Sequence, residues 1–395
     1  MKTILNFKEE SCYRNKHVLI IDGGSRQSLP MIRGFFNLGC IVSVFCSSKL
    51  DLGYCSKFAH NRIIGIINQY DEHQTLKSII ETLACNHYDL VIPTNDIIAT
   101  ILSKNKKDLS QFATIYVNDW ETYHKAYDKL QTMKKCMEND IPCPKTAEIN
   151  SISDFDETNF NYPLVVKPRS SFGARGFNVV NNRKEMIECF NRTEAKFGPS
   201  LIQEFIPQND KQYQVELLID KDHNCKAFLL MEKVRWYPVN GGSSTMNITI
   251  HDETIKKDCL KLMKLLNWRG YASLDLIRDS RDGLAKIMEI NPRLNGTAKI
   301  CFASGINLCK LILQDAFNDE VDEMLNYSDG IRLRYFHMDV LWFLRSPLRF
   351  KTCPSWFDFS NTVDEIIDVK DIRPAIVYSF VSIKKLFADK KNRSV

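Results

Sequence analysis

An acid and an amide stand two positions apart in an otherwise apolar stretch, KIMEINPRLNGT at residues 286–297. If this stretch is a strand, its side chains alternate between two faces, so Ile287, Glu289 and Asn291 point the same way and the residues between them point the other way. Polar groups on a half-buried strand are unfavourable unless they have partners. The pattern indicates either a strand end at the surface or a site that uses Glu289 and Asn291.

The preceding stretch, YASLDLIR at residues 271–278, is joined to it by the turn DSRDG and predicts a hairpin. This register places Asp275 opposite Glu289, to within two residues. Facing carboxylates repel each other, and a divalent cation removes that penalty. Oxygen ligands from Asp275, Glu289 and Asn291, completed by phosphate oxygens, describe a magnesium site. The alternative is an exposed hairpin with solvated acids.

A second stretch, VVKPRSSFGARGF at residues 165–177, joins a strand to a flexible loop. The loop carries small residues with many backbone N–H groups: Ser170, Ser171, Gly173 and Gly176. Such groups can form a concave nest for an anion, and Lys167 and Arg175 add positive charge on either side. A mobile loop of this kind could close over a nucleotide triphosphate. It could equally be a long hairpin turn.

A third stretch, LIQEFIP at residues 201–207, places Glu204 among apolar residues just before Pro207. Peptide groups in such a segment can bond to the edge of an adenine while apolar side chains sandwich the ring. This signal is weak by itself, because the pattern occurs by chance in many chains.

The composition limits the classes of function. Lys and Arg number 53 and Asp and Glu 48 in 395 residues, a mild and dispersed excess that argues against a nucleic-acid binder. The 13 cysteines show no C-x-x-C spacing, so neither a zinc site nor a disulfide framework is predicted.

No membrane or export signal is evident in the sequence. The N-terminal residues lack a long apolar core, and the apolar run AIVYSFVSI near the C-terminus is far shorter than the roughly 20 residues of a membrane span. We therefore expect a cytoplasmic protein without a membrane or nucleic-acid partner.

Strands and helices alternate through the first 109 residues, beginning with the apolar strand HVLIIDGG at residues 17–24. This order predicts a parallel sheet covered on both faces. The glycines in DGGSRQS lack the G-x-G-x-x-G pattern, so a tight turn is favoured over a dinucleotide site. A helical pair is predicted at 119–146, antiparallel strands from residue 162, and a last helix at 374–388.

In chain order the motifs are YDK at 127–129, VVKP, the Ser/Gly loop, QEFIP, LDLIR and MEINPRLNG. In this order the chain resembles the ATP-grasp superfamily, especially its carboxylate–amine ligases, which include relatives of the carbamoyl-phosphate synthase large chain and the D-aspartate ligases. The resemblance covers roughly residues 115–320.

The resemblance implies an α/β fold with an N-terminal Rossmann-like parallel sheet followed by an ATP-grasp fold of two α+β subdomains. The implied domains are 1–115 for the N-terminal domain, 116–325 for the ATP-grasp domain and 326–395 for a C-terminal extension packed on the core. Within the ATP-grasp domain, a small lid subdomain is expected at about 145–205 and a large one at about 206–325.

Roles for individual residues follow from the same resemblance. Nucleotide contacts are implied for Lys129, Lys167, Ser170, Ser171, Gly173, Gly176, Gln203, Glu204, Phe205, Ile206 and, more loosely, Asp210. Asp275, Glu289 and Asn291 match the metal ligands. Arg293 resembles the residue that steadies the acyl phosphate, and Lys233 and Arg235 fall where relatives often place cations. The stretch VNGGSST, with Gly241, Gly242, Ser243 and Ser244, resembles a substrate loop or is a surface turn.

The implied reaction is ATP-dependent ligation of a carboxylate to an amine, with ATP and Mg²⁺ or Mn²⁺ as cofactors. The implied partners are small-molecule carboxylate and amine substrates, and a homodimer is left open. Two alternatives are a bicarbonate-using carboxylase or carbamoyl-phosphate-type enzyme and a non-catalytic nucleotide-binding module.

Overall fold

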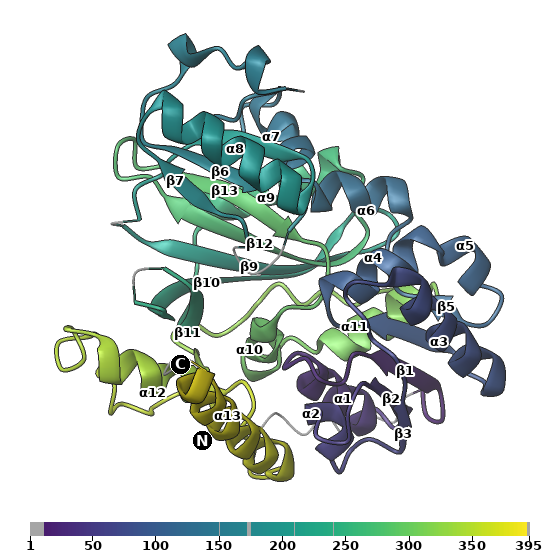
Figure 1. The fold of residues 1–395 in the computed structure, drawn as a ribbon. Coiled ribbons are helices and arrows are strands. Elements are labelled where there is room, and N and C mark those ends of the chain that lie inside the picture. The colour runs from purple at the N-terminus through teal and green to yellow at the C-terminus, as the bar shows by residue number, and fades with distance from the viewer. Residues whose placement is uncertain (1–11, 150, 172–174, 209, 240, 393–395) are drawn as a thin grey trace.

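The computed structural model shows a mixed α/β protein built on three sheets (Figure 1). It describes residues 12–149, 151–171, 175–208, 210–239 and 241–392, with the side chains of 383–392 excepted. The mixed α/β class and the parallel N-terminal sheet that the sequence predicts are confirmed. The domain limits drawn from the sequence stay a prediction.

The N-terminal sheet is parallel, with the order β3-β2-β1-β4-β5. Its elements are β1 (His17–Ile21), α1 (Ser28–Asn37), β2 (Ile41–Cys46), α2 (Leu52–Cys55), β3 (Asn61–Ile64), α3 (Glu72–Cys85), β4 (Leu90–Pro93), α4 (Asp96–Lys104), α5 (Lys106–Leu109) and β5 (Thr114–Ile115). Successive residues of β1 pack in different apolar clusters, Val18 with Phe35 of α1 and Leu19 with Ile79 of α3. Both faces of the sheet are therefore covered, which explains the continuous apolar run in β1.

A small antiparallel sheet, β7-β6-β8, packs against a single long helix. The predicted helical pair precedes this sheet, as α6 (Trp120–Tyr127) and α7 (Lys129–Met137). The elements that follow are η1 (Ile152–Asp154), η2 (Glu157–Asn159), β6 (Leu164–Pro168), β7 (Asn178–Val180), α8 (Arg183–Phe197) and β8 (Ser200–Glu204). Phe190 of α8 and Val166 of β6 share the core of this layer.

The large sheet has seven strands in the order β13-β12-β9-β10-β11-β14-β15. Its elements are β9 (Gln212–Ile219), β10 (Cys225–Tyr237), β11 (Ser243–Ile250), α9 (Glu253–Leu265), β12 (Gly270–Arg278), β13 (Ala285–Asn291), η3 (Gly296–Ala298), α10 (Lys299–Ala303), α11 (Leu308–Ala316), β14 (Arg332–Arg334), α12 (Phe336–Arg345), β15 (Thr362–Asp364) and α13 (Arg373–Asn392). Strands β14 and β15 come from the segment predicted as a C-terminal extension, and they lengthen this sheet.

The two faces of the large sheet contact different parts of the chain. Leu217 and Leu230 pack in a cluster with residues of α6 and α9, whereas Leu218 and Leu229 pack in a cluster with residues of α1, α10 and α11. The second face thus joins the large sheet to the N-terminal sheet through one continuous core.

Among the described residues, no single helix is long and apolar enough to cross a bilayer. One pair of helices, Gly296–Ala303 and Leu308–Ala316, reaches the required length and apolar composition only when taken together, and it is sharply bent between them.

Candidate active site

The hairpin of β12 and β13 brings the three predicted metal ligands together. Asp275 lies directly opposite Glu289, and Ser273 lies opposite Asn291. The amide Nδ2 of Asn291 donates to Asp275 Oδ2 at 3.1 Å. The predicted register of Asp275 and Glu289 is therefore confirmed.

The prediction that Ile287 shares a face with Glu289 is wrong. The register shifts between Asp275 and Leu276, whose partners are Glu289 and Ile287, so β13 carries a bulge at Met288. An extra residue in one strand reverses the alternation beyond it. Ile287 and Ile290 consequently pack in the same apolar cluster, while Glu289 stays a third exposed.

Two lysines from separate elements meet at Glu289. Lys129, the first residue of α7, places its Nζ 3.3 Å from Glu289 Oε2 and donates to the Ser171 carbonyl at 2.8 Å. Lys167 lies in β6 and is also buried. Burial, helped by the neighbouring Lys129, lowers the pKa of Lys167 to about 8, although Glu289 opposes this shift. The two lysines predicted to hold phosphates are thus adjacent, and without an anion between them they repel.

A third lysine, Lys233 of β10, forms an ion pair with the other acid of the hairpin, Asp275. Its Nζ donates to Asp275 Oδ1 at 2.5 Å. Burial acts to raise the pKa of Glu289, but the charges of Lys129, Lys167 and Lys233 outweigh burial and hold it below its usual value. Each of the two acids therefore already has an ammonium partner, Lys129 for Glu289 and Lys233 for Asp275.

The start of α7 fixes the position of Lys129. Asp128 caps the helix by accepting from the backbone N–H groups of Leu130 and Gln131, and it also pairs with Arg169 through two guanidinium nitrogens. The backbone N–H of Lys129 donates to the Arg169 carbonyl at 2.9 Å. This double link ties the helix to the strand that carries Lys167, and the sequence analysis did not identify either residue.

The Ser/Gly loop follows directly from this strand. Ser171 contacts Lys129 through its carbonyl, and Gly176 closes the loop with a φ of +74°. Gly173 lies outside the described residues.

The predicted adenine segment, residues 201–207, begins inside β8 and continues past the last residue of that strand, Glu204. Glu204 accepts from the backbone N–H of Lys145 at 2.8 Å and pairs with Arg281 and Lys286. Gln203 is buried, and its Oε1 has no hydrogen-bond partner. Phe205 and Ile206 follow beyond the end of the strand, and Asp210 accepts from its neighbouring backbone N–H.

Arg293 connects the hairpin to the N-terminal sheet. Its Nη2 lies 2.9 Å from Asp96 Oδ2 and 3.3 Å from Asn291 Oδ1, while its Nε is buried without a partner. Asp96 begins α4, just after the carboxyl end of β4. In open parallel sheets, ligands bind outside this edge. Arg293 therefore links the acidic hairpin to the edge where a substrate is expected.

Arg235 is the predicted catalytic residue that the structure does not bring to the site. Its guanidinium is buried against both carboxylate oxygens of Asp339 in α12, at 2.9 and 3.0 Å. The strand is irregular between Lys233 and Arg235, so the two cations do not repeat the expected alternation.

The proposed substrate loop forms the connection between β10 and β11. Gly241, Gly242 and Ser243 are exposed, and Ser244 is half-buried opposite Trp236. Their exposure is consistent with the surface-turn alternative.

A cluster of buried polar side chains beside the hairpin was not predicted from the sequence. Glu216 of β9 accepts from the hydroxyls of Tyr271 and Thr297, and Gln214 donates to both Glu216 and Ser273. Burial raises the pKa of Glu216 to about 7. The pairing of β9 with β12 creates this cluster, and long-range pairing of that kind leaves no local sequence signal.

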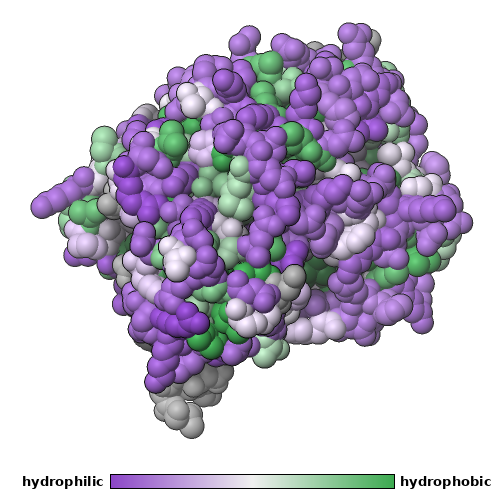
Figure 2. Space-filling model, turned by 90° about the horizontal axis from the view of Figure 1, so that it is seen from above, coloured by the Kyte–Doolittle hydropathy of each residue, from purple (hydrophilic) through white to green (hydrophobic). Residues whose placement is uncertain are grey.

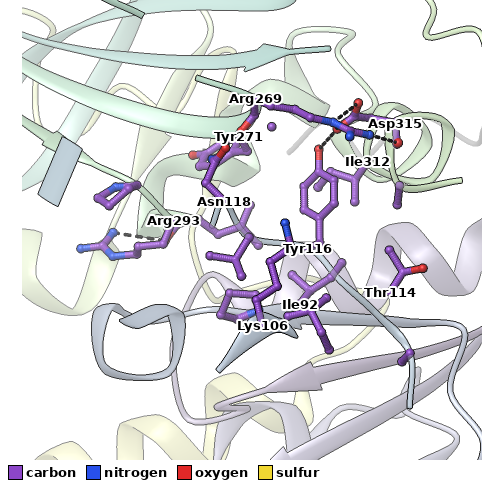
Figure 3. A pocket seen from close by; sticks show the side chains of 18 of the residues that line it. Ile92, Lys106, Thr114, Tyr116, Asn118, Arg269, Tyr271, Arg293, Ile312 and Asp315 are labelled. Carbon is purple, nitrogen blue, oxygen red and sulfur yellow. Dashed lines mark hydrogen bonds and ion pairs between the residues drawn. The ribbon is translucent and has the colours of Figure 1, made fainter. Parts of the chain in front are cut away.

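A cavity of about 350 Å³ lies near the site but is separate from it (Figure 3). Its walls come from β4, β5, β12 and α11, and include Tyr116, Arg269 and Asp315. Arg293 contributes to the wall, yet its guanidinium points away from Tyr116 and Asp315. Of the predicted site residues, only Arg293 lines this cavity.

The donor set fits a hard divalent cation. Asp275, Glu289 and Asn291 offer only oxygen ligands, which suit Mg²⁺ or Mn²⁺. No group of three or more His, Cys, Asp or Glu side chains suited to a metal occurs within the described part of the chain. A metal here would therefore need further oxygens, such as those of a nucleotide.

Comparisons with known proteins agree with this arrangement. Residues 126–297 match the family model of the ATP-grasp domain. A D-aspartate ligase of Enterococcus faecium (strain Aus0004) is 25% identical over 354 residues, which cover 82% of this chain and 83% of that protein.

Solved structures share the fold. An L-amino acid ligase from Bacillus licheniformis superposes with a TM-score of 0.62 at 20% identity, covering 78% of this chain and 75% of that one. The biotin carboxylase domain of a Hydrogenobacter thermophilus 2-oxoglutarate carboxylase, in complex with MgADP, ADP and bicarbonate, superposes with a TM-score of 0.67 at 14% identity, covering 81% and 74%. At these identities the likeness shows the fold alone.

Proposed function

We propose that this chain, whose residues 126–297 match the ATP-grasp domain, is an ATP-grasp ligase that activates a carboxylate as an acyl phosphate and joins it to an amine. The observation that carries the proposal is the convergence of Asp275 and Glu289 with Lys129 and Lys167. Two carboxyl side chains beside two buried ammonium groups form a site for a metal-bound polyphosphate.

In the first step, an oxygen of the substrate carboxylate attacks the γ-phosphorus of ATP, the bond to the β–γ bridging oxygen breaks, and ADP leaves. Lys129 and Lys167 would hold the phosphates, with the backbone of Ser171 beside Lys129. The main contributions here are positioning and neutralisation of charge.

In the second step, the amine nitrogen attacks the carbonyl carbon of the acyl phosphate, phosphate leaves, and the nitrogen loses a proton. Arg293 would stabilise negative charge in both steps, because it bonds to Asn291 at the hairpin and to Asp96 at the edge of the N-terminal sheet. Arg235 has no role in this proposal, since it is buried against Asp339.

Asp275, Glu289 and Asn291 would hold Mg²⁺ or Mn²⁺, which neutralises phosphate charge when bound. Lys233 now donates to Asp275, so cation binding requires that this ammonium group move away or remain beside a bound phosphate. For the adenine, we propose the peptide groups of Phe205 and Ile206, with Gln203 and Glu204 supporting the segment.

The first substrates to test are small acids and amines. The similarity to a D-aspartate ligase supports aspartate as the first candidate carboxylate. A homodimer and a cytoplasmic location are further proposals, tested by sedimentation velocity and by cell fractionation.

The decisive test is ADP and phosphate release with Mg-ATP and pools of amino acids and other carboxylates. We expect turnover that depends on both a carboxylate and an amine. Glu289→Gln should lower it by at least about 100-fold, since it removes an ionised ligand from the polyphosphate site.

The matched control is Glu121→Gln, whose exposed carboxylate pairs with Lys125 in the same helix. Full activity of Glu289→Gln would contradict the site. Turnover that requires bicarbonate and no amine would favour the carboxylase alternative.

A further inference from the structure

The segment between α12 and β15 exposes large apolar side chains at one end of the molecule. The exposed fractions are 63% for Leu344, 58% for Leu348, 74% for Phe350, 59% for Phe357 and 48% for Phe359. We call these five residues the C-terminal patch. Together they expose on the order of several hundred Å² of apolar surface, which is large for a free protein surface and marks an interaction site.

The aromatic part of the patch is continuous because its rings share half-buried neighbours. Phe343 contacts the rings of Phe350 and Phe357, with centroids 5.4 and 5.6 Å apart. Trp356 contacts Phe357 and Phe359 at 5.2 and 6.4 Å. The exposed rings therefore form the outer side of one aromatic cluster.

Basic residues border this cluster. Arg345 and Lys351 are exposed, and Arg349 lies over the ring of Phe350. The nearby acids are already neutralised: Asp339 is buried between Arg235 and Arg334, and Asp358 pairs with Arg332. The free charge at the patch is therefore positive.

We propose that the C-terminal patch docks this protein onto the surface of an anionic lipid bilayer. Aromatic and aliphatic side chains would enter the boundary between headgroups and acyl chains, while the basic side chains meet anionic headgroups. A second copy of the chain fits less well, because a symmetric contact would bring Arg345, Arg349 and Lys351 against the same residues.

The position of the patch suits this role. In Figure 1, α12 and the loop after it project from the end of the molecule opposite α3 and α5. At the corresponding left-hand edge of Figure 2, hydrophobic and hydrophilic side chains lie side by side. The sequence-based expectation of no membrane partner rested on the absence of a span, and surface docking needs no span.

The test is co-sedimentation of the full chain with vesicles of phosphatidylcholine, with and without about a third phosphatidylglycerol. We expect binding to the anionic vesicles that weakens as salt rises from about 0.05 M to about 0.5 M, because screening removes the electrostatic part. Phosphatidylcholine vesicles should bind at least about tenfold more weakly.

Two double variants separate the apolar and charged contributions. Phe350→Asp with Phe357→Asp, and Arg345→Glu with Lys351→Glu, should each weaken binding at least about tenfold. The matched control is Tyr70→Asp with Lys77→Glu. Tyr70 is exposed just before α3, and Lys77 is exposed within α3, at the opposite end of the molecule. The control should bind as the unaltered chain does, and circular dichroism should show that all variants are folded.

Three results would overturn the proposal. The first is no binding to anionic vesicles, and the second is equal weakening by the control. The third is a concentration-dependent dimer in sedimentation velocity that the Phe350→Asp, Phe357→Asp variant abolishes, which would make the patch an interface between copies. None of these results bears on the ligase assay, which uses soluble substrates.

Discussion

The charge on the ammonium group of Lys167 is energetically unfavourable in the folded protein. It is buried beside Lys129, and burial lowers its pKa to about 8 from an ordinary value near 10.5. Holding this group charged at neutral pH therefore costs the folded protein about 3 kcal/mol. A bound polyphosphate would remove this cost, so the unfavourable charge is a signature of a site built for an anion.

We predict that Lys167→Met stabilises the unliganded protein while it abolishes ATP turnover. At pH 7 the free energy of unfolding should rise by up to about 3 kcal/mol in urea titrations. Between about pH 8 and pH 10.5 the folded state of the unaltered protein releases the Lys167 proton before the unfolded state does, so its stability rises with pH. The difference between the two proteins should therefore shrink toward pH 10.

The control for this experiment is Lys135→Met, at a lysine of α7 whose side chain is 43% exposed. A stability difference that does not change with pH would show that titration of Lys167 is not its cause.

A second prediction concerns Lys233, which neutralises Asp275 in the absence of a metal. Lys233→Met should destabilise the metal-free protein by about 1–2 kcal/mol, because it leaves a partly buried carboxylate without its ammonium partner. Mg²⁺ should then raise the melting temperature more in the variant than in the unaltered protein, since a bound ligand stabilises the folded state.

Lys211→Met is the matched control, because Lys211 forms a more exposed ion pair with Glu232. An unchanged response to Mg²⁺ in Lys233→Met would separate Asp275 from the metal site.

The residues of the site differ in how far the sequence could reveal them. Asp275 and Glu289 lie in one hairpin, so turn length and alternation were enough to pair them. Glu216 lies on a neighbouring strand, and Asp96 begins a helix beside a separate sheet. No spacing along the chain indicates such partners. Arg235 had the right type and spacing but lies against Asp339, which is 104 residues away in sequence.

Among the elements, the loop that carries Ser171 and Gly176 depends on one backbone conformation. Gly176 has a φ of +74°, and a Cβ added there would lie 2.8 Å from Pro168 at the end of β6. Strand and loop are therefore packed so closely that only glycine fits, and the same strand carries Lys167.

We predict that Gly176→Ala weakens ATP binding at least about tenfold, because the left-handed conformation and the contact with Pro168 both oppose a side chain. Isothermal titration calorimetry with a non-hydrolysable ATP analogue measures this change. Gly198→Ala is the control, since Gly198 has a similar φ of +83° but no atom within 4 Å of an added Cβ. Equal effects of the two substitutions would mean that backbone strain alone is responsible.

Element boundaries were predictable where apolar periodicity was strong, as for β1, α3 and β12. The bulge at Met288 was not predictable in this way. An inserted residue changes which face of the strand Ile287 lies on, but it leaves the composition of the strand the same. The order of β9 between β10 and β12 also lies beyond a local pattern, since it depends on pairing across more than 50 residues.

At the scale of the whole molecule, the ion pair between Arg293 and Asp96 joins the acidic hairpin to the N-terminal sheet. We predict that Asp96→Asn lowers turnover by about 10- to 100-fold, because Arg293 loses the charge that orients it. The affinity for ATP should change less than about threefold, since Lys129 and Lys167 are untouched. Steady-state kinetics and calorimetry separate these effects.

Asp119→Asn is the control for Asp96, because Asp119 forms a single exposed ion pair with Lys106. A parallel loss of ATP affinity and turnover in Asp96→Asn would indicate a general disturbance of the fold. The sequence predicted both sheets that this ion pair connects but not their mutual placement, which depends on the shared core of α1, α10 and α11.

Arg33 of α1 is buried, and its guanidinium is bonded to Asp368 and Asp371, more than 330 positions later. During synthesis, the sheet that α1 covers is therefore made long before the two carboxylates that neutralise this buried cation. Until residue 371 has been made, the cation on α1 does not have both of these carboxylates. Local assembly of the N-terminal sheet alone therefore cannot complete the burial of Arg33.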